Sequence, residues 1–287
     1  AAGARLWPRT DVAVVIGSRF ELLDIRWRHR PEGLKLIRID IDPAEVRRIA
    51  AEVNLLADAA EGASALAEAV LRVGPPPRRD EVVAEAKAAA EQAIQCVQPQ
   101  LDYLRVIRDV LPRDGFFVEE ISQVGFTSIF GFPVYAPRTL VTSGHQGTLG
   151  FGFPTALGVK AAHPDKAVVS ICGDGGFMFA AQELATAVQY RLNLVTIVFN
   201  NQAFGNVYRD QQESFAGRLL GSELINPDFV RFAESFGVQA WRVASPAQLR
   251  PVLEQAFAAD RPVLIEVSVP RGSDTSPWQF LHPTFAL

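Results

Sequence analysis

The stretch "GDGGFMFAAQELATAVQYRLNLVTIVFNN", from Gly173 to Asn201, decides the fold. The apolar run "KAVVSIC" stands directly before it, and a second apolar run, "LVTIVF", lies near its end. Runs of this kind are typical of buried strands. Between them, residues 180–190 have a helical pattern and would span roughly 16 Å, while the second strand would return roughly 20 Å. These similar lengths predict a right-handed βαβ unit in a parallel sheet.

Polar residues follow both predicted strands. Asp174 comes after the first, and the pair ending in Asn201 comes after the second. Because parallel strands end at one edge of a sheet, we expect Asp174 and Asn201 to lie close together although 27 positions separate them. Their hard oxygen atoms suit Mg²⁺, which often binds substrate phosphates as well. Helix capping and turn formation are the simpler alternative, but the matched strand ends favour a metal–diphosphate site. Backbone N–H groups could approach phosphate oxygens at the glycines Gly173, Gly175 and Gly176.

The rest of the chain repeats the alternation of strands and helices, which predicts an α/β protein with parallel sheets. In the first part, "VAVVIGS" and "LKLIRIDID" are predicted strands, and Asp42 is a predicted N-cap. The segment "GPPPRRD" predicts a linker. We therefore expect a first unit over residues 1–74, a linker and helix over 75–98, and a second unit over 99–287. Within the second unit, a helix is predicted over 226–237 with Asn226 as its cap.

Composition excludes several classes of function. The 287 residues are 48% hydrophobic and 21% charged, which is typical of globular domains, and the net charge is −4. No cluster of lysine and arginine indicates a nucleic-acid or membrane surface, and the apolar runs are too short to cross a bilayer. Two cysteines cannot form a disulfide framework, so we expect a cytoplasmic protein. The chain begins with "AAGARLW" and not with methionine, so we expect it to be part of a longer protein.

The motif resembles the signature of thiamine diphosphate (ThDP) enzymes, in which GDG and NN are about two dozen residues apart. Here 24 residues separate Gly175 from Asn200. Two further segments are similar to the acetolactate-synthase-like branch of that family. "LIRIDIDPAEV" resembles the end of its central domain, and "TSGHQGTLGFGFPTALG" resembles its second cofactor segment. The resemblance implies three-layer α/β/α units, with part of a Rossmann-like central domain followed by the ThDP diphosphate-binding domain.

The resemblance also implies a role for individual residues. Mg²⁺ would be bound by the side chains of Asp174 and Asn201 and by the main-chain carbonyl of Ala203. Leu149 would wedge between the two rings of ThDP, and the carbonyl of Gly147 would accept from the 4′-amino group. The full set of implied cofactor-binding residues is Gln123, Gly147, Leu149, Gly173, Asp174, Gly175, Gly176 and Asn201.

The family's activating glutamate lies in an N-terminal pyrimidine-binding domain, so no catalytic residue is expected in this chain. Glu119 and Glu120 are not candidates to replace it. In the family, the cofactor lies between the pyrimidine domain of one subunit and the diphosphate domain of another. The resemblance therefore implies a homodimer or homotetramer, and we expect this chain to be inactive alone. FAD, which many relatives bind through the central domain, is left open.

The implied activity is decarboxylation of a 2-oxo acid and transfer of the resulting acyl-anion equivalent. An oxidase or acyltransferase of the same superfamily is an alternative, as is a non-catalytic homologue that binds ThDP or only assembles with a partner. A nucleotide-binding Rossmann protein is disfavoured because "IGSRF" lacks the dinucleotide fingerprint. Asn206 and Asp210 stand where acetolactate synthases have Met and Trp, which predicts a more polar acceptor pocket. The candidate substrate neighbours are His145, Phe204, Asn206 and Tyr208.

Overall fold

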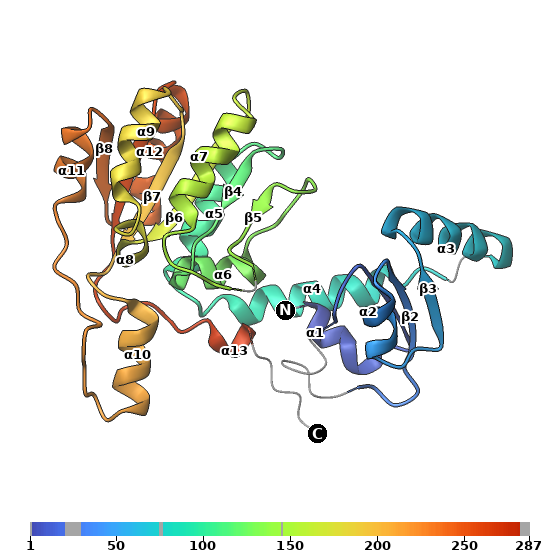
Figure 1. Cartoon of the computed structure of the whole chain (residues 1–287). Helices are drawn as coiled ribbons and strands as arrows, with labels where there is room; N and C mark the ends of the chain where they lie inside the picture. Colours follow the sequence, from blue (N-terminus) through green and yellow to red (C-terminus); the bar gives the residue numbers. More distant parts are fainter. Residues whose placement is uncertain (1, 21–29, 75–76, 145, 282–287) are drawn as a thin grey trace. The chain divides into compact units, whose positions relative to one another are not determined.

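The computed structural model describes residues 2–20, 30–74, 77–144 and 146–281. His145, one of the candidate substrate neighbours, lies outside these ranges. The chain divides into two compact units (Figure 1). The first comprises Ala1–Ala93 with Gln279–Leu287, and the second comprises Ile94–Trp278.

The first unit contains a parallel sheet in the order β1-β2-β3, formed by β1 (Val12–Ile16), β2 (Lys35–Asp40) and β3 (Val53–Leu56). The predicted cap of α2 (Pro43–Arg48) is confirmed, since the Asp42 carboxylate accepts from the backbone N–H of Ala44 at 2.8 Å. The sequence did not predict β3, because its residues are mostly exposed and show no alternation. The other helices are α1 (Ala2–Leu6), η1 (Trp7–Arg9), α3 (Ala59–Val73) and α4 (Asp80–Ile94).

The second unit is built on a parallel sheet in the order β5-β4-β6-β7-β9-β8, which confirms the predicted α/β class. Strands β6 and β7 are neighbours, with Gly173 opposite Phe199, so the residues that follow them emerge at the same edge. The strand bounds are β4 (Phe116–Val118), β5 (Leu140–Val141), β6 (Val168–Gly173), β7 (Val195–Asn200), β8 (Gln239–Val243) and β9 (Val263–Ser268).

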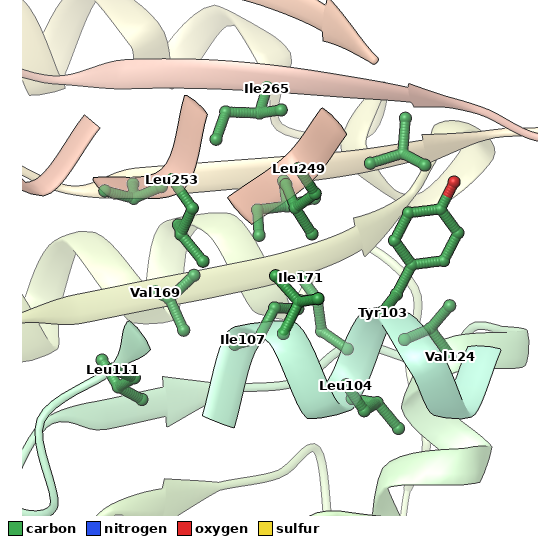
Figure 2. Packing of buried hydrophobic residues seen from close by; sticks show 14 of the residues in the cluster. Tyr103, Leu104, Ile107, Leu111, Val124, Val169, Ile171, Leu249, Leu253 and Ile265 are labelled. Atoms are coloured by element: carbon green, nitrogen blue, oxygen red, sulfur yellow. The ribbon is translucent and has the colours of Figure 1, made fainter. Parts of the chain in front are cut away.

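Helices cover both faces of this sheet, as the three-layer prediction requires. On one face, α5 (Gln100–Val110) and α12 (Pro246–Ala258) pack against Ile171 of β6 (Figure 2). On the other face, the adjacent Cys172 lies in a second apolar cluster. Alternation of neighbouring strand residues between two cores is the expected consequence of the two-residue period of a strand. The second cluster contains residues of α7 (Gly152–Ala162), α9 (Leu184–Gln189) and α11 (Phe229–Ser235).

Three helical segments differ from the sequence predictions. The single helix predicted over residues 180–190 consists of two pieces, η3 (Ala181–Glu183) and α9, and an additional short helix, α8 (Asp174–Phe177), begins directly at Asp174 and buries Phe177 in the second core cluster. The sequence did not predict α6 (Gln123–Gly131), whose apolar residues show little helical periodicity. The predicted cap Asn226 is wrong, since Asp228 caps α11. The remaining elements are α10 (Gly205–Ser214) and α13 (Trp278–Leu281).

Within the residues that the structure describes, no helix has the length and apolar character needed to cross a membrane.

Two adjacent acids, Glu119 and Glu120, are buried at the end of β4. Glu119 is only 3% exposed, and burial raises its pKa from 4.5 to about 7, with a smaller contribution from the neighbouring charge of Glu120. A backbone hydrogen bond from Ser143 opposes that shift. Glu120 accepts a hydrogen bond from the backbone N–H of Gly150, and burial also raises its pKa.

We expect Leu253→Ala in α12 to lower the free energy of unfolding by about 2 to 5 kcal/mol, because the side chain is fully buried between helix and sheet. Leu220→Ala, at a side chain that is 84% exposed, should change it by less than about 0.5 kcal/mol. Urea unfolding curves of both variants provide the measurement. Equal effects of the two substitutions would contradict the assigned core.

Glu119 should also make stability depend on pH. Between about pH 4.5 and 7 the folded state binds more protons than the unfolded state, so the free energy of unfolding should fall as pH rises through this range. Glu119→Gln keeps an acceptor for the Ser143 N–H but cannot ionise. In this variant the free energy of unfolding should therefore decrease by up to about 3 kcal/mol less over the same pH range. Chemical denaturation at a series of pH values tests this, with the exposed Glu254→Gln as the matched control. A slope that is unchanged in Glu119→Gln would disprove it.

Candidate functional site

A cavity of about 440 Å³ lies where β6 and β7 end in the second unit. Most of the residues that the sequence singled out line this cavity, although Gly147 and Tyr208 do not. Tyr208 lines a neighbouring cavity instead, together with Arg271. The Arg271 guanidinium lies 5.7 Å from the centre of the Tyr208 ring. The singled-out residues that line the main cavity are Gln123, Leu149, Gly173, Asp174, Gly175, Gly176, Asn201, Ala203, Phe204 and Asn206.

Asp174 is the buried acid of the cavity, with 2% of its surface exposed. One carboxylate oxygen, Oδ2, accepts a hydrogen bond of 2.7 Å from Nδ2 of Asn226. Burial raises the pKa of Asp174 above its usual value, because removal from water disfavours the charged form. Several hydrogen bonds oppose this shift. They come from the Asn226 side chain and from the backbone N–H groups of Gly175, Gln202 and Ala203.

The loop after β7 brings Asn201 and Ala203 to the cavity. Gln202 between them has a φ of +56°, which turns the backbone sharply. Asn201 accepts through Oδ1 from the backbone N–H of Ala203 at 3.2 Å. Ala203 also forms an isolated antiparallel bridge with Glu223, and the N–H of Phe204 donates to the carbonyl of Ser222. The loop is therefore held in place by the segment around Ser222.

Two glycines of the motif, Gly175 and Gly176, lie too close to neighbouring side chains to carry a Cβ without a shift. A Cβ on Gly175 would lie 2.4 Å from the ring of Phe204. A Cβ on Gly176 would lie 2.4 Å from the carboxylate of Glu120. The sequence interpretation assigned both positions to close approach of a phosphate, and the structure adds that neither could carry a side chain in this packing.

An ion pair that the sequence did not indicate adjoins the cavity. Arg209 of α10 donates through Nη2 to Oδ2 of Asp274 at 2.7 Å, and through Nη1 to Oε1 of Gln123 at 2.7 Å. A guanidinium can only donate, so the amide atom of Gln123 that faces Arg209 must be the oxygen Oε1. The nitrogen Nε2 therefore lies on the other side of the amide. That Nε2 is buried and has no acceptor in the described residues.

The loop before α7 contributes Leu149, which lines the cavity. Gly147 and Gly150 on either side have φ values of +58° and +78°, a conformation that suits glycine. The backbone N–H of Gly150 donates to the buried Glu120. These contacts fix the loop that places Leu149.

Residues of α10 and of the C-terminal segment form another part of the site. Asn206 lines the cavity and accepts from Nε1 of Trp278 at 2.7 Å. Trp278 in turn packs on Phe126, with ring centres 4.9 Å apart. Asp210, the other residue expected to make the acceptor pocket polar, is exposed and does not line the cavity.

The described residues fit a metal bound with a diphosphate ester. Asp174 and Asn201 carry hard oxygen atoms at one edge of the sheet, and the unpartnered Nε2 of Gln123 is a donor that needs an acceptor. The cavity volume of about 440 Å³ is in the range of ligand pockets. The described residues contain no group of three or more His, Cys, Asp or Glu that could hold a metal. A cation here would therefore depend on amide, carbonyl and phosphate oxygens as well as Asp174.

Sequence reasoning missed several residues of the site. Asn226 was assigned to a helix cap, and Arg209 and Asp274 come from segments far apart in the chain. Tyr103 of α5 also lines the cavity, and the sequence did not single it out. No local pattern distinguishes such residues from ordinary packing or surface positions.

Comparison with known proteins identifies the same region. Residues 121–267 match the family described as "Thiamine pyrophosphate enzyme, C-terminal TPP binding domain". A probable acetolactate synthase large subunit of Methanocaldococcus jannaschii is 32% identical over 275 residues, which cover 90% of this chain and 46% of that protein. The large subunit of acetolactate synthase isozyme 3 of Escherichia coli is 28% identical, covering 94% of this chain and 50% of that protein.

A solved structure gives the same result. The ThDP-dependent 4-hydroxybenzoylformate decarboxylase of Rhodococcus jostii matches with a TM-score of 0.69 and 25% identity, covering 91% of this chain and 49% of that one. The chain thus spans about half the length of the relatives it matches. With the family domain matched over residues 121–267 and the fold shared, the chain belongs to the thiamine diphosphate-dependent, acetolactate-synthase-like enzymes.

Proposed function

We propose that this chain forms the C-terminal part of a ThDP- and Mg²⁺-dependent enzyme that decarboxylates a 2-oxo acid and transfers the resulting acyl-anion equivalent to an acceptor. The observation that carries the proposal is the convergence of Asp174 and Asn201 on one cavity, together with Gln123 and Leu149. When bound, ThDP supplies a nucleophilic carbon and an electron sink for decarboxylation.

The chain's own residues would bind and orient the cofactor. Asp174, the side chain of Asn201 and the carbonyl of Ala203 would hold Mg²⁺, whose octahedron takes oxygen ligands and cofactor phosphates. The free Nε2 of Gln123 would donate to the cofactor, which would satisfy a buried group that otherwise destabilises the site by about 1 to 3 kcal/mol. Leu149 and the apolar lining would exclude water from the reacting atoms. Phe204 and Asn206 would lie next to the substrate.

The remainder of the enzyme would come from outside these residues. The family resemblance places the activating glutamate in a pyrimidine-binding domain of another subunit, so the proposal includes a homodimer or homotetramer. It also includes a cytoplasmic location, which the low cysteine content favours. FAD is not part of the proposal.

Asp174→Ala should abolish Mg²⁺-dependent ThDP binding, because it removes the single carboxylate among the proposed ligands. In calorimetric titrations of the full protein, we expect the apparent affinity for ThDP to fall by more than about 100-fold. Asp114→Ala is the matched control, since that exposed acid pairs with Lys166 away from the site. ThDP binding that is unchanged in Asp174→Ala would refute the assignment of the metal site.

The 287-residue chain alone should fail to turn over any 2-oxo acid at saturating ThDP and Mg²⁺. The reason is that the proposal assigns the activating glutamate to a pyrimidine-binding domain outside these 287 residues. A panel of 2-oxo acids, assayed by CO₂ release with the full protein in parallel, measures this. Robust turnover by the chain alone would show that the second subunit's domain is not required.

A further inference from the structure

One contact fixes the orientation of the Asn206 amide. Nε1 of Trp278 donates to Oδ1 of Asn206 at 2.7 Å, and an indole N–H can only donate, so the oxygen end of the amide faces Trp278. Asn206 lines the main cavity, whereas the described lining does not include Trp278. The other end of the amide, Nδ2, has no acceptor among the residues that the structure describes. Asn206 therefore offers the cavity a donor and not an acceptor.

The segment that carries Trp278 is itself anchored. The backbone N–H of Thr275 donates to the carbonyl of Gln98 at 3.0 Å, and the carbonyl of Thr275 accepts from Nε2 of Gln100 at 2.7 Å. The Trp278 ring packs on Phe126, which also lines the main cavity. The indole thus reaches Asn206 from a position that backbone hydrogen bonds and packing both hold.

A second amide of the cavity is oriented in the same way. Asn206 and Arg209 are three residues apart on α10 and share one face of that helix. Arg209 binds Asp274 and Asn206 binds Trp278, so this face contacts the same C-terminal segment twice. Arg209 also faces the oxygen of Gln123, whose buried Nε2 has no acceptor in the described residues. Both amides therefore keep their oxygens on donors of the protein and leave their nitrogens for a ligand.

The start of α10 favours the same kind of ligand group. Gly205, Asn206 and Val207, which open the helix, all line the main cavity. The first N–H groups of a helix lack partners within it, and the helix dipole favours negative charge at this end. Gln123 lies alongside, since a Cβ on Gly205 would be 3.7 Å from its Cγ. A ligand oxygen is thus the chemical complement of this part of the cavity.

We propose that Asn206 is a specificity-determining residue that selects substrates with a hydrogen-bond-accepting oxygen on the side chain, and that Trp278 is the positioning residue that holds its donor toward the cavity. The inference deepens the proposed function and rests on it, because the substrate is taken to be a 2-oxo acid. A hydrocarbon side chain would leave Nδ2 of Asn206 without a partner once the bound substrate has excluded water. The carboxylate and carbonyl that all 2-oxo acids share cannot provide this selection.

The experiment compares pairs of 2-oxo acids in which a methyl group replaces a hydroxyl group, such as hydroxypyruvate and 2-oxobutanoate, over several side-chain lengths. Values of kcat/KM are measured by CO₂ release with the full protein at saturating ThDP and Mg²⁺, for the wild type, Asn206→Leu and Trp278→Phe. The Leu variant keeps a similar side-chain shape without a donor, and the Phe variant keeps an aromatic ring beside Phe126 without the N–H. Trp241→Phe is the matched control, because Trp241 lies on β8 outside the described cavity lining.

We expect the wild type and the Trp241 control to prefer the hydroxyl-bearing member of at least one pair by about tenfold or more, since the analogue leaves a donor unpaired. In Asn206→Leu this preference should disappear. Trp278→Phe should lower it at least about threefold, because the amide is no longer held with its nitrogen toward the cavity. The apparent affinity for ThDP should stay within about twofold of the wild type in both variants, since neither residue is a proposed cofactor ligand.

Three results would count against these assignments. An unchanged preference in Asn206→Leu would overturn the inference. An equal loss of kcat/KM on both members of every pair would also overturn it, because Asn206 would then bind a group that all 2-oxo acids share. Absence of ThDP-dependent CO₂ release by the wild type with every 2-oxo acid tested would instead overturn the proposed function, and this inference with it.

Discussion

The site depends on one constraint, which is the burial of the Asp174 carboxylate at the end of a central strand. A charged group that is 2% exposed must be solvated by protein donors or by a cation, because removing it from water is costly. The structure provides donors from two directions, Asn226 on one side and backbone N–H groups of the loop after β7 on the other. The turn at Gln202 and the side chain of Asn226 thus both provide donors to this carboxylate.

The parallel pairing of β6 and β7 makes these contacts geometrically available. Each strand is buried on both faces, so its residues are nearly all apolar apart from the hydroxyl residues Ser170 and Thr196, and Asp174 and Asn201 follow at the strand ends. A buried charged residue inside the sheet has hydrogen-bond partners of its own. Glu266 on β9 is buried, but it accepts hydrogen bonds from both Asn200 and Arg242. The core therefore supports the site through a hydrogen-bonded connection as well as through packing.

Sequence patterns predicted the parts of this arrangement that are local. The apolar runs and the βαβ lengths led to the correct sheet, and the proximity of Asp174 and Asn201 followed from strand ends alone. Contacts between distant segments could not be predicted, because Arg209 and Asp274 have no shared periodicity in the sequence. Asn226 was predicted to be the helix cap because a helix does begin close to it. The residue that caps α11 is Asp228, two positions later, so the local pattern led to the wrong residue.

The charges around the cavity explain why a cation should accompany an anionic cofactor. The charged residues among those that line it, Asp174 and Asp274, are both acidic, and no lysine, arginine or histidine is among the lining residues that the structure describes. The nearby Arg209 is engaged by Asp274 and by Gln123. Repulsion between the buried Asp174 and a diphosphate would be strong at this low dielectric, and a divalent ion between them converts it into attraction. Under the proposed function, a metal would thus be the electrostatic condition for binding a diphosphate in this cavity, and the residues that contact Asp174 would influence the binding of both.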